Sequence, residues 1–218
     1  MGRDRFGTTQ AGEARETQRL EAFSDGIFAI AATLLILEVR VPLLHDTPSE
    51  GALGGALRDL WPAYLAYATS FATILVTWIN HHVILRLVVR SDHPFLLLNG
   101  LLLALITAVN FPTALLAEYI GHPGERLAAQ VYTGVFLAMA IVFNLVWRYA
   151  SGRGRLLGAD IDPAVVRAIH RRFRFGPLYY VAAFALTFID AKVAFGACIF
   201  LAVLFALPYS PTPATEQA

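Results

Sequence analysis

Residues 19–37 of the chain, RLEAFSDGIFAIAATLLIL, carry charge only in the first seven positions, and the twelve positions that follow are uncharged. About 20 predominantly apolar residues in a helix are needed to cross a hydrocarbon core about 30 Å thick. The stretch therefore predicts a membrane-spanning helix over about residues 23–41, bounded by Arg19 and Pro42.

Three further stretches contain no Asp, Glu, Lys or Arg at all: Leu60–Leu85, Phe95–Ala117 and Leu127–Trp147. Each is long enough to span a bilayer, and we expect spans at about 60–85, 95–117 and 127–147. The chain as a whole is 57% hydrophobic and 15% charged, whereas an ordinary soluble domain carries about 25% charged residues. This composition predicts an all-α, polytopic membrane protein and excludes a soluble enzyme, a disordered chain and a disulfide-stapled secreted domain.

Two shorter apolar segments follow, at about 175–189 and 193–207, separated by Asp190-Ala191-Lys192. A helix of about 15 residues is about 22 Å long, which is less than the thickness of the core. A short helical hairpin and a partly re-entrant pair both fit, but one long helix would bury two charges in the membrane. We expect two thin spans, which makes six transmembrane helices in all.

The Lys and Arg residues divide unequally between the loops. The N-terminal tail (residues 1–20), the second loop and the fourth loop hold 13 of the 17, and the other side holds Arg40, Arg58, Arg126 and Lys192. Basic loops stay in the cytoplasm, so we expect a cell-membrane protein with its N-terminal tail and its C-terminal tail (209–218) both cytoplasmic. The first 20 residues lack the apolar core of a signal peptide.

The fourth loop contains Asp162-Pro163 before a basic stretch, which predicts a helix with Asp162 as N-cap. Such a helix either touches anionic headgroups or is an ordinary cytosolic linker. Motifs of soluble enzymes are not visible, and Cys198, the single cysteine, has no partner for an internal disulfide. The sequence therefore predicts no enzyme activity, no cofactor and no metal, and a net charge of +1 gives no indication of a nucleic-acid partner.

Polar residues recur at the cytoplasmic ends of three predicted spans. Ser24 and Asp25 begin the first span, Trp78, His81 and His82 end the second, and Asn99 lies early in the third. A hydrogen-bonded network that joins them would satisfy these costly groups. The ordinary alternatives are a helix cap for Ser24-Asp25 and interfacial positions for Trp78 and the histidines. Adjacent histidines point about 100° apart on a helix and chelate one ion poorly.

Large apolar residues form one stripe on the first span. Ile30, Leu34 and Leu37 lie within about 40° of one another at about 100° per residue, and Thr33 flanks them. Such a stripe ordinarily faces lipid or the protein core.

The stretch from Arg19 through Phe23-Ser24-Asp25 to Leu35 resembles the signature of the FSD-motif potassium channels, the transmembrane protein 175 family. Further matching positions are Tyr67-x-x-Ser70-Phe71, Trp78-x-x-His81-His82 and Asn99. The resemblance implies a homotetramer of six-helix subunits, with a pore lined by the first helix and without a TVGYG filter.

By the same resemblance, Ile30, Leu34 and Leu37 form the pore constriction, and Thr33 adds a hydroxyl layer beside it. A structural network holds the pore helix in place, and its implied members are Arg19, Phe23, Ser24, Asp25, Trp78, His81 and Asn99. An apolar constriction strips water more cheaply from K⁺ than from Na⁺, which predicts a potassium-preferring cation channel in a lipid bilayer. The alternatives are a proton-coupled secondary transporter using Asp25 and His81, a haem protein or intramembrane enzyme, and a non-conducting scaffold.

Overall fold

The computed structural model describes residues 4–43, 49–152 and 156–207, with residues 4–14 described by their backbone alone. The predicted C-terminal tail, residues 209–218, lies outside the described residues. Helices account for almost all regular structure within these ranges. In chain order they are α1 (Asp4–Leu34), the 3₁₀ turn η1 (Leu35–Glu38), α2 (Glu50–Asp59), α3 (Trp61–Leu87), α4 (His93–Ala108), α5 (Asn110–Tyr119), α6 (Glu125–Ser151), α7 (Pro163–Arg174), α8 (Gly176–Leu186) and α9 (Ala191–Ala206).

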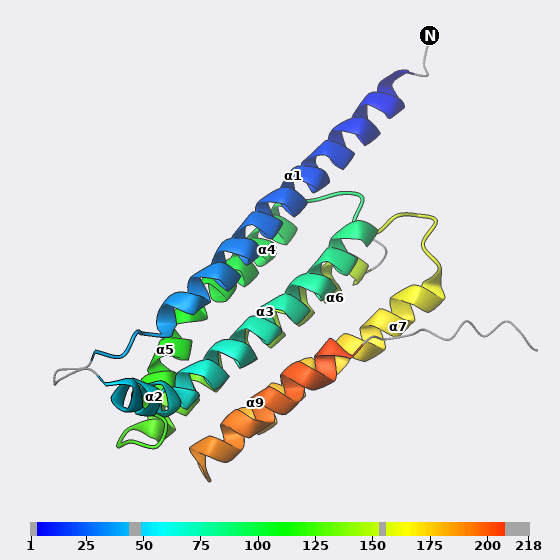
Figure 1. Ribbon diagram of the computed structural model, residues 1–218. Coiled ribbons are helices and arrows are strands. Elements are labelled where there is room, and N and C mark those ends of the chain that lie inside the picture. Colours follow the sequence, from blue (N-terminus) through cyan, green and yellow to red (C-terminus); the bar gives the residue numbers. More distant parts are fainter. Residues whose placement is uncertain (1–3, 44–48, 153–155, 208–218) are drawn as a thin grey trace, which may run out of the picture.

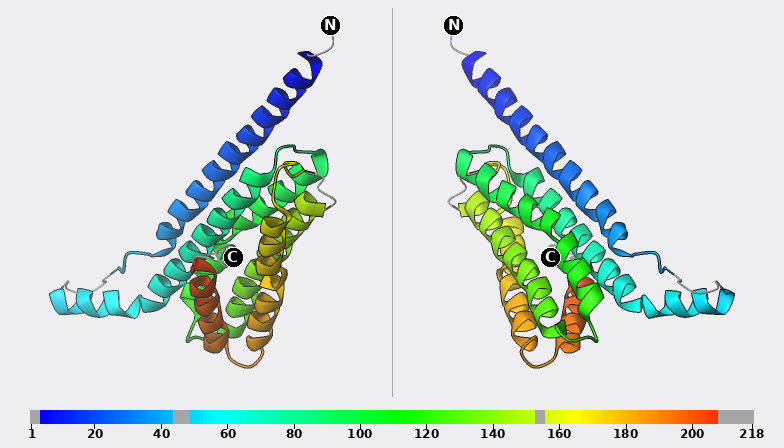
Figure 2. Two further views of the ribbon diagram at one scale, coloured as in Figure 1. Left: turned by 90° about the vertical axis from the view of Figure 1, so that its right-hand side faces the viewer. Right: turned by 90° about the vertical axis from the view of Figure 1, so that its left-hand side faces the viewer.

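Four segments are long and apolar enough to cross a membrane: Arg15–Glu38, Trp61–Leu87, His93–Tyr119 and Glu125–Ser151. They lie side by side in one bundle, with α1 along its edge (Figure 1). Helices α8 and α9 occupy the two short segments that follow, and they fold back on one another as a hairpin (Figure 2). The all-helical, multi-span fold that the sequence predicts is present.

Most of the predicted N-terminal tail is part of the first helix. The sequence predicts a polar tail over residues 1–20, but α1 begins at Asp4 and continues without interruption to Leu34. Its N-terminal part projects beyond the rest of the bundle (Figure 2). The N-terminal part of α1 is polar because it is a helix that lies outside the apolar bundle.

The third predicted span is broken at Val109 into α4 and α5. Pro112 explains the break, because proline has no N–H to bond the carbonyl four residues earlier and its ring crowds that carbonyl. Helical i to i−4 hydrogen bonding resumes directly after Pro112, where Thr113 N donates to Val109 O at 3.1 Å. The two short helices thus still cover one span.

Helix α2 is an element that the sequence analysis did not predict. Ser49 caps it by accepting a hydrogen bond from Ala52 N at 3.1 Å. None of its residues is buried, and it lies away from the bundle (Figure 2). A helix without a buried face has no apolar stripe in its sequence, so only the capping residue indicates where it begins.

The predicted breaks near the C-terminal end are present. Asp162 caps α7 by accepting from Ala164 N at 2.7 Å. Asp190 caps α9 by accepting from Lys192 N and Val193 N at 2.8 and 2.9 Å. Asp190 is therefore a helix cap at an exposed turn, and no long helix buries it.

The core of the bundle lies around α6, which packs against α4, α5, α8 and α9. Tyr132 and Phe136 on α6 meet edge to face at 4.7 Å between ring centroids, and Tyr132 also meets Phe195 on α9 at 5.8 Å. Trp147 is fully buried near the end of the same helix. Helix α1 adds Phe28 and Ala31 to this core and packs mainly against α3 and α4.

Two loops that the sequence analysis places on the same side of the membrane pair with each other. Val88 and Leu157 form an isolated antiparallel bridge, and Val89 N donates to Leu156 O at 2.9 Å. Because one loop follows α3 and the other follows α6, the ends of these two helices lie at the same end of the bundle. The chain must therefore cross the bundle an even number of times between the end of α3 and the end of α6.

Candidate functional site: the faces of the first helix

Helix α1 presents two different faces. Ser24, Phe28, Ala31 and Leu35 are buried, with exposed fractions of 3% or less. Their spacing of three or four residues places them on one stripe of a helix. This buried stripe contacts α3 and α4 and fixes the rotation of α1 in the bundle.

The opposite stripe carries large apolar side chains in the open. Phe23, Ile30, Leu34 and Leu37 are exposed to 62, 58, 43 and 68%. Leu37 lies in η1, where the helix tightens to 3₁₀ geometry, and the others lie on α1. The predicted constriction residues therefore share one largely exposed surface of the chain.

Thr33 lies beside this exposed stripe. Its hydroxyl donates a hydrogen bond to the Ile30 carbonyl of its own helix at 3.0 Å. A hydroxyl that donates to its own backbone keeps its oxygen lone pairs directed outward. Thr33 thus offers acceptor capacity next to Ile30 and Leu34.

A buried chain of hydrogen bonds links α1 to α4 and α3. Asn99 Nδ2 donates to Ser24 Oγ at 3.1 Å, and Asn99 Oδ1 lies 2.7 Å from His81 Nε2. With the amide oxygen in this orientation, His81 Nε2 is the donor. All three side chains are at most 1% exposed. Asn99 therefore bridges the first and second spans through one amide.

A second bond reinforces the same contact. The indole Nε1 of Trp78 on α3 donates to Asp25 Oδ1 on α1 at 2.8 Å. The ring of His81 also packs on Phe28, with centroids 5.3 Å apart. Five of the seven residues predicted for the network thus meet at one level of the bundle: Ser24, Asp25, Trp78, His81 and Asn99.

The remaining two predicted members lie apart from these five. Arg19 is exposed and makes no hydrogen bond or salt bridge with any side chain for which the structure describes a position. Phe23 points outward with the apolar stripe. Both residues are on the exposed side of α1.

A second polar cluster lies deeper in the bundle. The Ser70 hydroxyl on α3 is 2.7 Å from Thr113 Oγ1 on α5 and 3.0 Å from the Tyr132 hydroxyl on α6. All three residues are fully or almost fully buried. Sequence analysis singled out only Ser70, since hydroxyls scattered in apolar spans ordinarily bond to their own helices.

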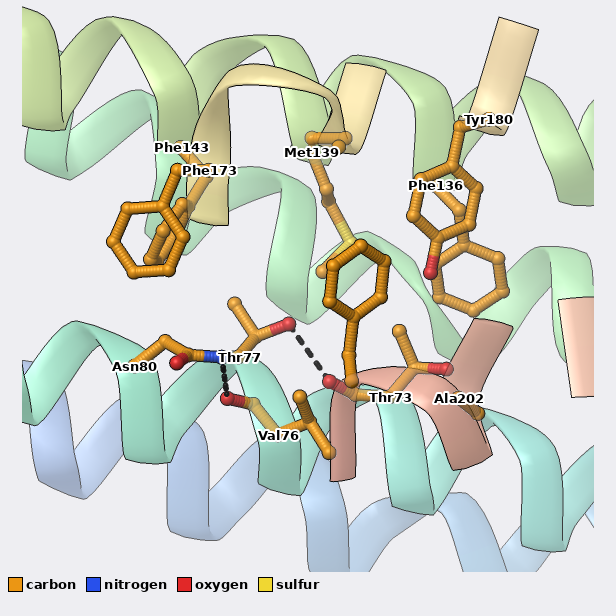
Figure 3. Close-up of a pocket in the computed structure, with 13 residues that line it drawn as sticks. Thr73, Val76, Thr77, Asn80, Phe136, Met139, Phe143, Phe173, Tyr180 and Ala202 are labelled. Atoms are coloured by element: carbon orange, nitrogen blue, oxygen red, sulfur yellow. Dashed lines mark hydrogen bonds between the residues drawn. The ribbon is translucent and has the colours of Figure 1, made fainter. Parts of the chain in front are cut away.

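A cavity of about 80 Å³ lies between α3, α6 and the C-terminal helices (Figure 3). Thr73, Thr77 and Asn80 line one wall, and aromatic side chains line the other. The polar groups of this wall bond within α3: Thr77 Oγ1 donates to Thr73 O at 2.7 Å and Asn80 Nδ2 to Val76 O at 2.9 Å. Sequence analysis did not predict this cavity, which forms only where the helices meet.

The arrangement can be compared with known proteins. The family model described as "Endosomal/lysosomal potassium channel TMEM175" matches residues 19–109, a range that holds both faces of α1 and its bonded partners on α3 and α4. A potassium channel of Chamaesiphon minutus is 55% identical over 91% of this chain and 97% of its own length. The chain belongs to the TMEM175 family.

Further relatives and a solved structure agree with this assignment. A potassium channel of Streptomyces collinus is 41% identical over 93% of this chain and 98% of its own length. The endosomal/lysosomal proton channel TMEM175 of Bos taurus is 30% identical over 91% of this chain but only 43% of its own length. The crystal structure of the lysosomal potassium-selective channel TMEM175 homologue from Chamaesiphon minutus superimposes with a TM-score of 0.79. It has 53% identity and covers 88% of this chain and 97% of the other.

Proposed function

We propose that this chain is the subunit of a potassium-preferring cation channel in which α1 lines the pore of a homotetramer of six-helix subunits. One observation carries the proposal: the exposed apolar stripe of α1 lies opposite a face that is held by buried hydrogen bonds. The bacterial relatives named potassium channels support the choice of ion.

The stripe matches what a constriction needs. Ile30 and Leu37 are about 10 Å apart along the axis at 1.5 Å per residue, and both residues are more than half exposed. Four such stripes around a central axis form a narrow apolar passage that an ion crosses only after losing water. Dehydration costs less for K⁺ than for the smaller Na⁺, so the passage favours K⁺ without a ring of carbonyls.

The bonded face explains why the stripe can hold its position. A pore helix that rotates carries its constriction away from the axis. The contacts of Asp25 with Trp78 and of Ser24 with Asn99 fix the rotation of α1 against α3 and α4. We assign these residues the role of positioning the pore helix rather than of coordinating ions.

The same placement fits the proposed topology. Pairing of the α3–α4 and α6–α7 loops puts Arg86, Arg90 and Arg148 at one end of the bundle. The excess of basic residues there favours a cytoplasmic location in the cell membrane. Both termini would then be cytoplasmic.

The alternative is a proton-coupled transporter that uses Asp25 and His81 as a relay. His81 is fully buried, and its bonding nitrogen contacts Asn99 rather than Asp25. A relay needs a hydrogen-bonded or hydrated path between its groups, and the contacts of these two residues run to different partners. This arrangement disfavours the transporter.

The proposal is tested with purified full-length protein in liposomes loaded with K⁺ or with Na⁺. We expect a leak that is larger for K⁺, and we expect Ile30→Asn and Leu34→Asn to raise basal flux by hydrating the constriction. Leu97→Asn is the matched control, because Leu97 is 61% exposed on α4. Equal flux in all four proteins would overturn the pore assignment, and saturable uptake driven by a proton gradient would establish the transporter instead.

A further inference from the structure

Three side chains with metal-ligating atoms converge where α1 crosses α3, outside the buried hydrogen-bond chain. They are Glu21 and Asp25 on α1 and His82 on α3, and one ligand atom of each lies within 4.8 Å of the other two. Glu21 and Asp25 are four residues apart, so one face of α1 presents both carboxylates. The two helices thus bring a mixed nitrogen and oxygen donor set to one point.

The donor atoms are partly shielded from water. The side chain of His82 is 39% exposed and that of Glu21 is 28% exposed. The Nδ1 atom of His82 is itself buried and makes no hydrogen bond of acceptable geometry, although Glu21 Oε1 lies only 3.0 Å away. In a neutral imidazole that lacks a proton on Nδ1, the nitrogen lone pair faces the carboxylate oxygen. A cation between the two atoms would remove that repulsion.

The remaining groups at this point orient the ligands. Asp25 Oδ1 accepts the indole N–H of Trp78 at 2.8 Å, which leaves Oδ2 for another partner. The Trp78 ring stacks on His82 with centroids 6.0 Å apart and the planes inclined by 28°. Hydrogen bonding to a ligand carboxylate and packing on a ligand imidazole are the usual outer contacts of a metal site.

We propose that Glu21, Asp25 and His82 bind a divalent transition-metal cation of the Zn²⁺ type. Three protein ligands with one imidazole and two carboxylates leave an open position, as in many four-coordinate zinc sites. The imidazole favours this class over Mg²⁺ and Ca²⁺, which prefer oxygen ligands. Donors bound at about 2.1 Å lie about 3.4 Å apart in a tetrahedron, so side-chain rotations that bring the donor atoms closer by up to about 1.4 Å complete the site.

Only one histidine of the adjacent pair takes part. His81 is engaged with Asn99 on the other face of α3, which agrees with the expectation that two neighbouring histidines do not share an ion. Because the ligands come from both helices, the bound cation would tie α1 to α3. On the proposed function, this tie restrains the pore helix and lowers potassium flux.

The test uses full-length protein in detergent and measures Zn²⁺ binding by competition with a chromophoric chelator. We expect one Zn²⁺ per subunit, with affinity at least about tenfold weaker in Glu21→Gln and in His82→Gln. Glu16→Gln and His93→Gln are matched controls, because both parent residues are exposed and lie outside the cluster. Substitution of Asp25 is avoided because this residue also holds the helix through Trp78.

A fluorescence measurement tests whether the metal ion binds beside His82. Co²⁺ bound at His82 should quench the fluorescence of the stacked Trp78, and the quenching should be lost in Trp78→Phe and in His82→Gln. Equal Zn²⁺ affinity in all variants and controls would overturn the site. So would a wild-type protein that binds no Zn²⁺, because His82 and Glu21 would then form a simple ion pair. Binding is scored separately from flux, so a non-conducting protein that binds Zn²⁺ would contradict only the proposed channel.

Discussion

Trp78 on α3 donates its indole N–H to Asp25 Oδ1 on α1 over 2.8 Å. The bond joins a residue about two thirds of the way along α3 to a residue near the start of the apolar part of α1. Together with the Ser24–Asn99–His81 chain, it anchors one side of α1 to α3 and α4 by hydrogen bonds, while the opposite face stays apolar and exposed. The predictions below test this division.

Replacing Asn99 by Leu should destabilise the subunit by about 2 kcal/mol or more. The substitution keeps the volume but leaves a buried hydroxyl and a buried imidazole without partners, each costing about 1–3 kcal/mol. Unfolding titrated with SDS measures the change. Asn80→Leu is the control, since Asn80 bonds only within its own helix and should shift the transition less. A larger shift for Asn80→Leu would contradict the network.

Asp25→Asn should be milder than Asp25→Leu. The amide keeps an oxygen that accepts the Trp78 N–H, whereas leucine removes the acceptor and loses about 1.5–3 kcal/mol of a charge-assisted bond. Yield of assembled protein on size-exclusion chromatography and the SDS midpoint both report the difference. Equal behaviour of the two variants would show that the charge, and not the hydrogen bond, matters at this position.

Leu34→Cys in a Cys198→Ala background should form disulfide-linked dimers on mild oxidation. Side chains that face a common axis in a tetramer approach one another within the reach of a disulfide. Cys198 is buried, so its removal takes away the one competing thiol without opening the surface. Leu97→Cys, on an exposed face of α4, should remain monomeric on a denaturing gel, and cross-linking at both positions to the same extent would argue for random collision.

Cysteines introduced in two loops should label from opposite sides of the membrane. Asp160→Cys lies in the α6–α7 loop and His122→Cys in the α5–α6 loop, and both positions are exposed. In intact cells that express the variants with Cys198 also replaced by alanine, a membrane-impermeant maleimide should modify His122→Cys from outside. It should modify Asp160→Cys only after the cells are permeabilised. Labelling of both from outside would contradict the orientation that the basic residues predict.

Tyr132→Phe should cost only about 1 kcal/mol, because it removes one hydroxyl and keeps the packed ring. A double-mutant cycle with Ser70→Ala isolates the bond between them, since each single variant removes the same 3.0 Å contact. In SDS unfolding, the double variant should be destabilised by less than the sum of the two single variants. Additive effects would place the energetic weight of this cluster on the Ser70–Thr113 contact.

Much of the fold was predictable because hydropathy and charge act locally. The absence of ionisable residues over Leu60–Leu85 and Leu127–Trp147 is enough to predict α3 and α6. The caps of α7 and α9 follow from Asp162 and Asp190, whose carboxylates satisfy free backbone N–H groups. Helix α2 escaped prediction because none of its residues is buried.

The sequence by itself determined that the chain is helical, that it crosses a membrane, and that polar groups from three segments lie at a similar depth. These properties follow from residue type and from rise per residue. Only the tertiary structure decided which of these groups meet: Asn99 bridges Ser24 and His81, while Asp25 takes Trp78. The cluster of Ser70, Thr113 and Tyr132, and the meeting of His82 with Glu21, also depend on the rotation of each helix about its axis. That rotation is set by packing between helices, which no local pattern specifies.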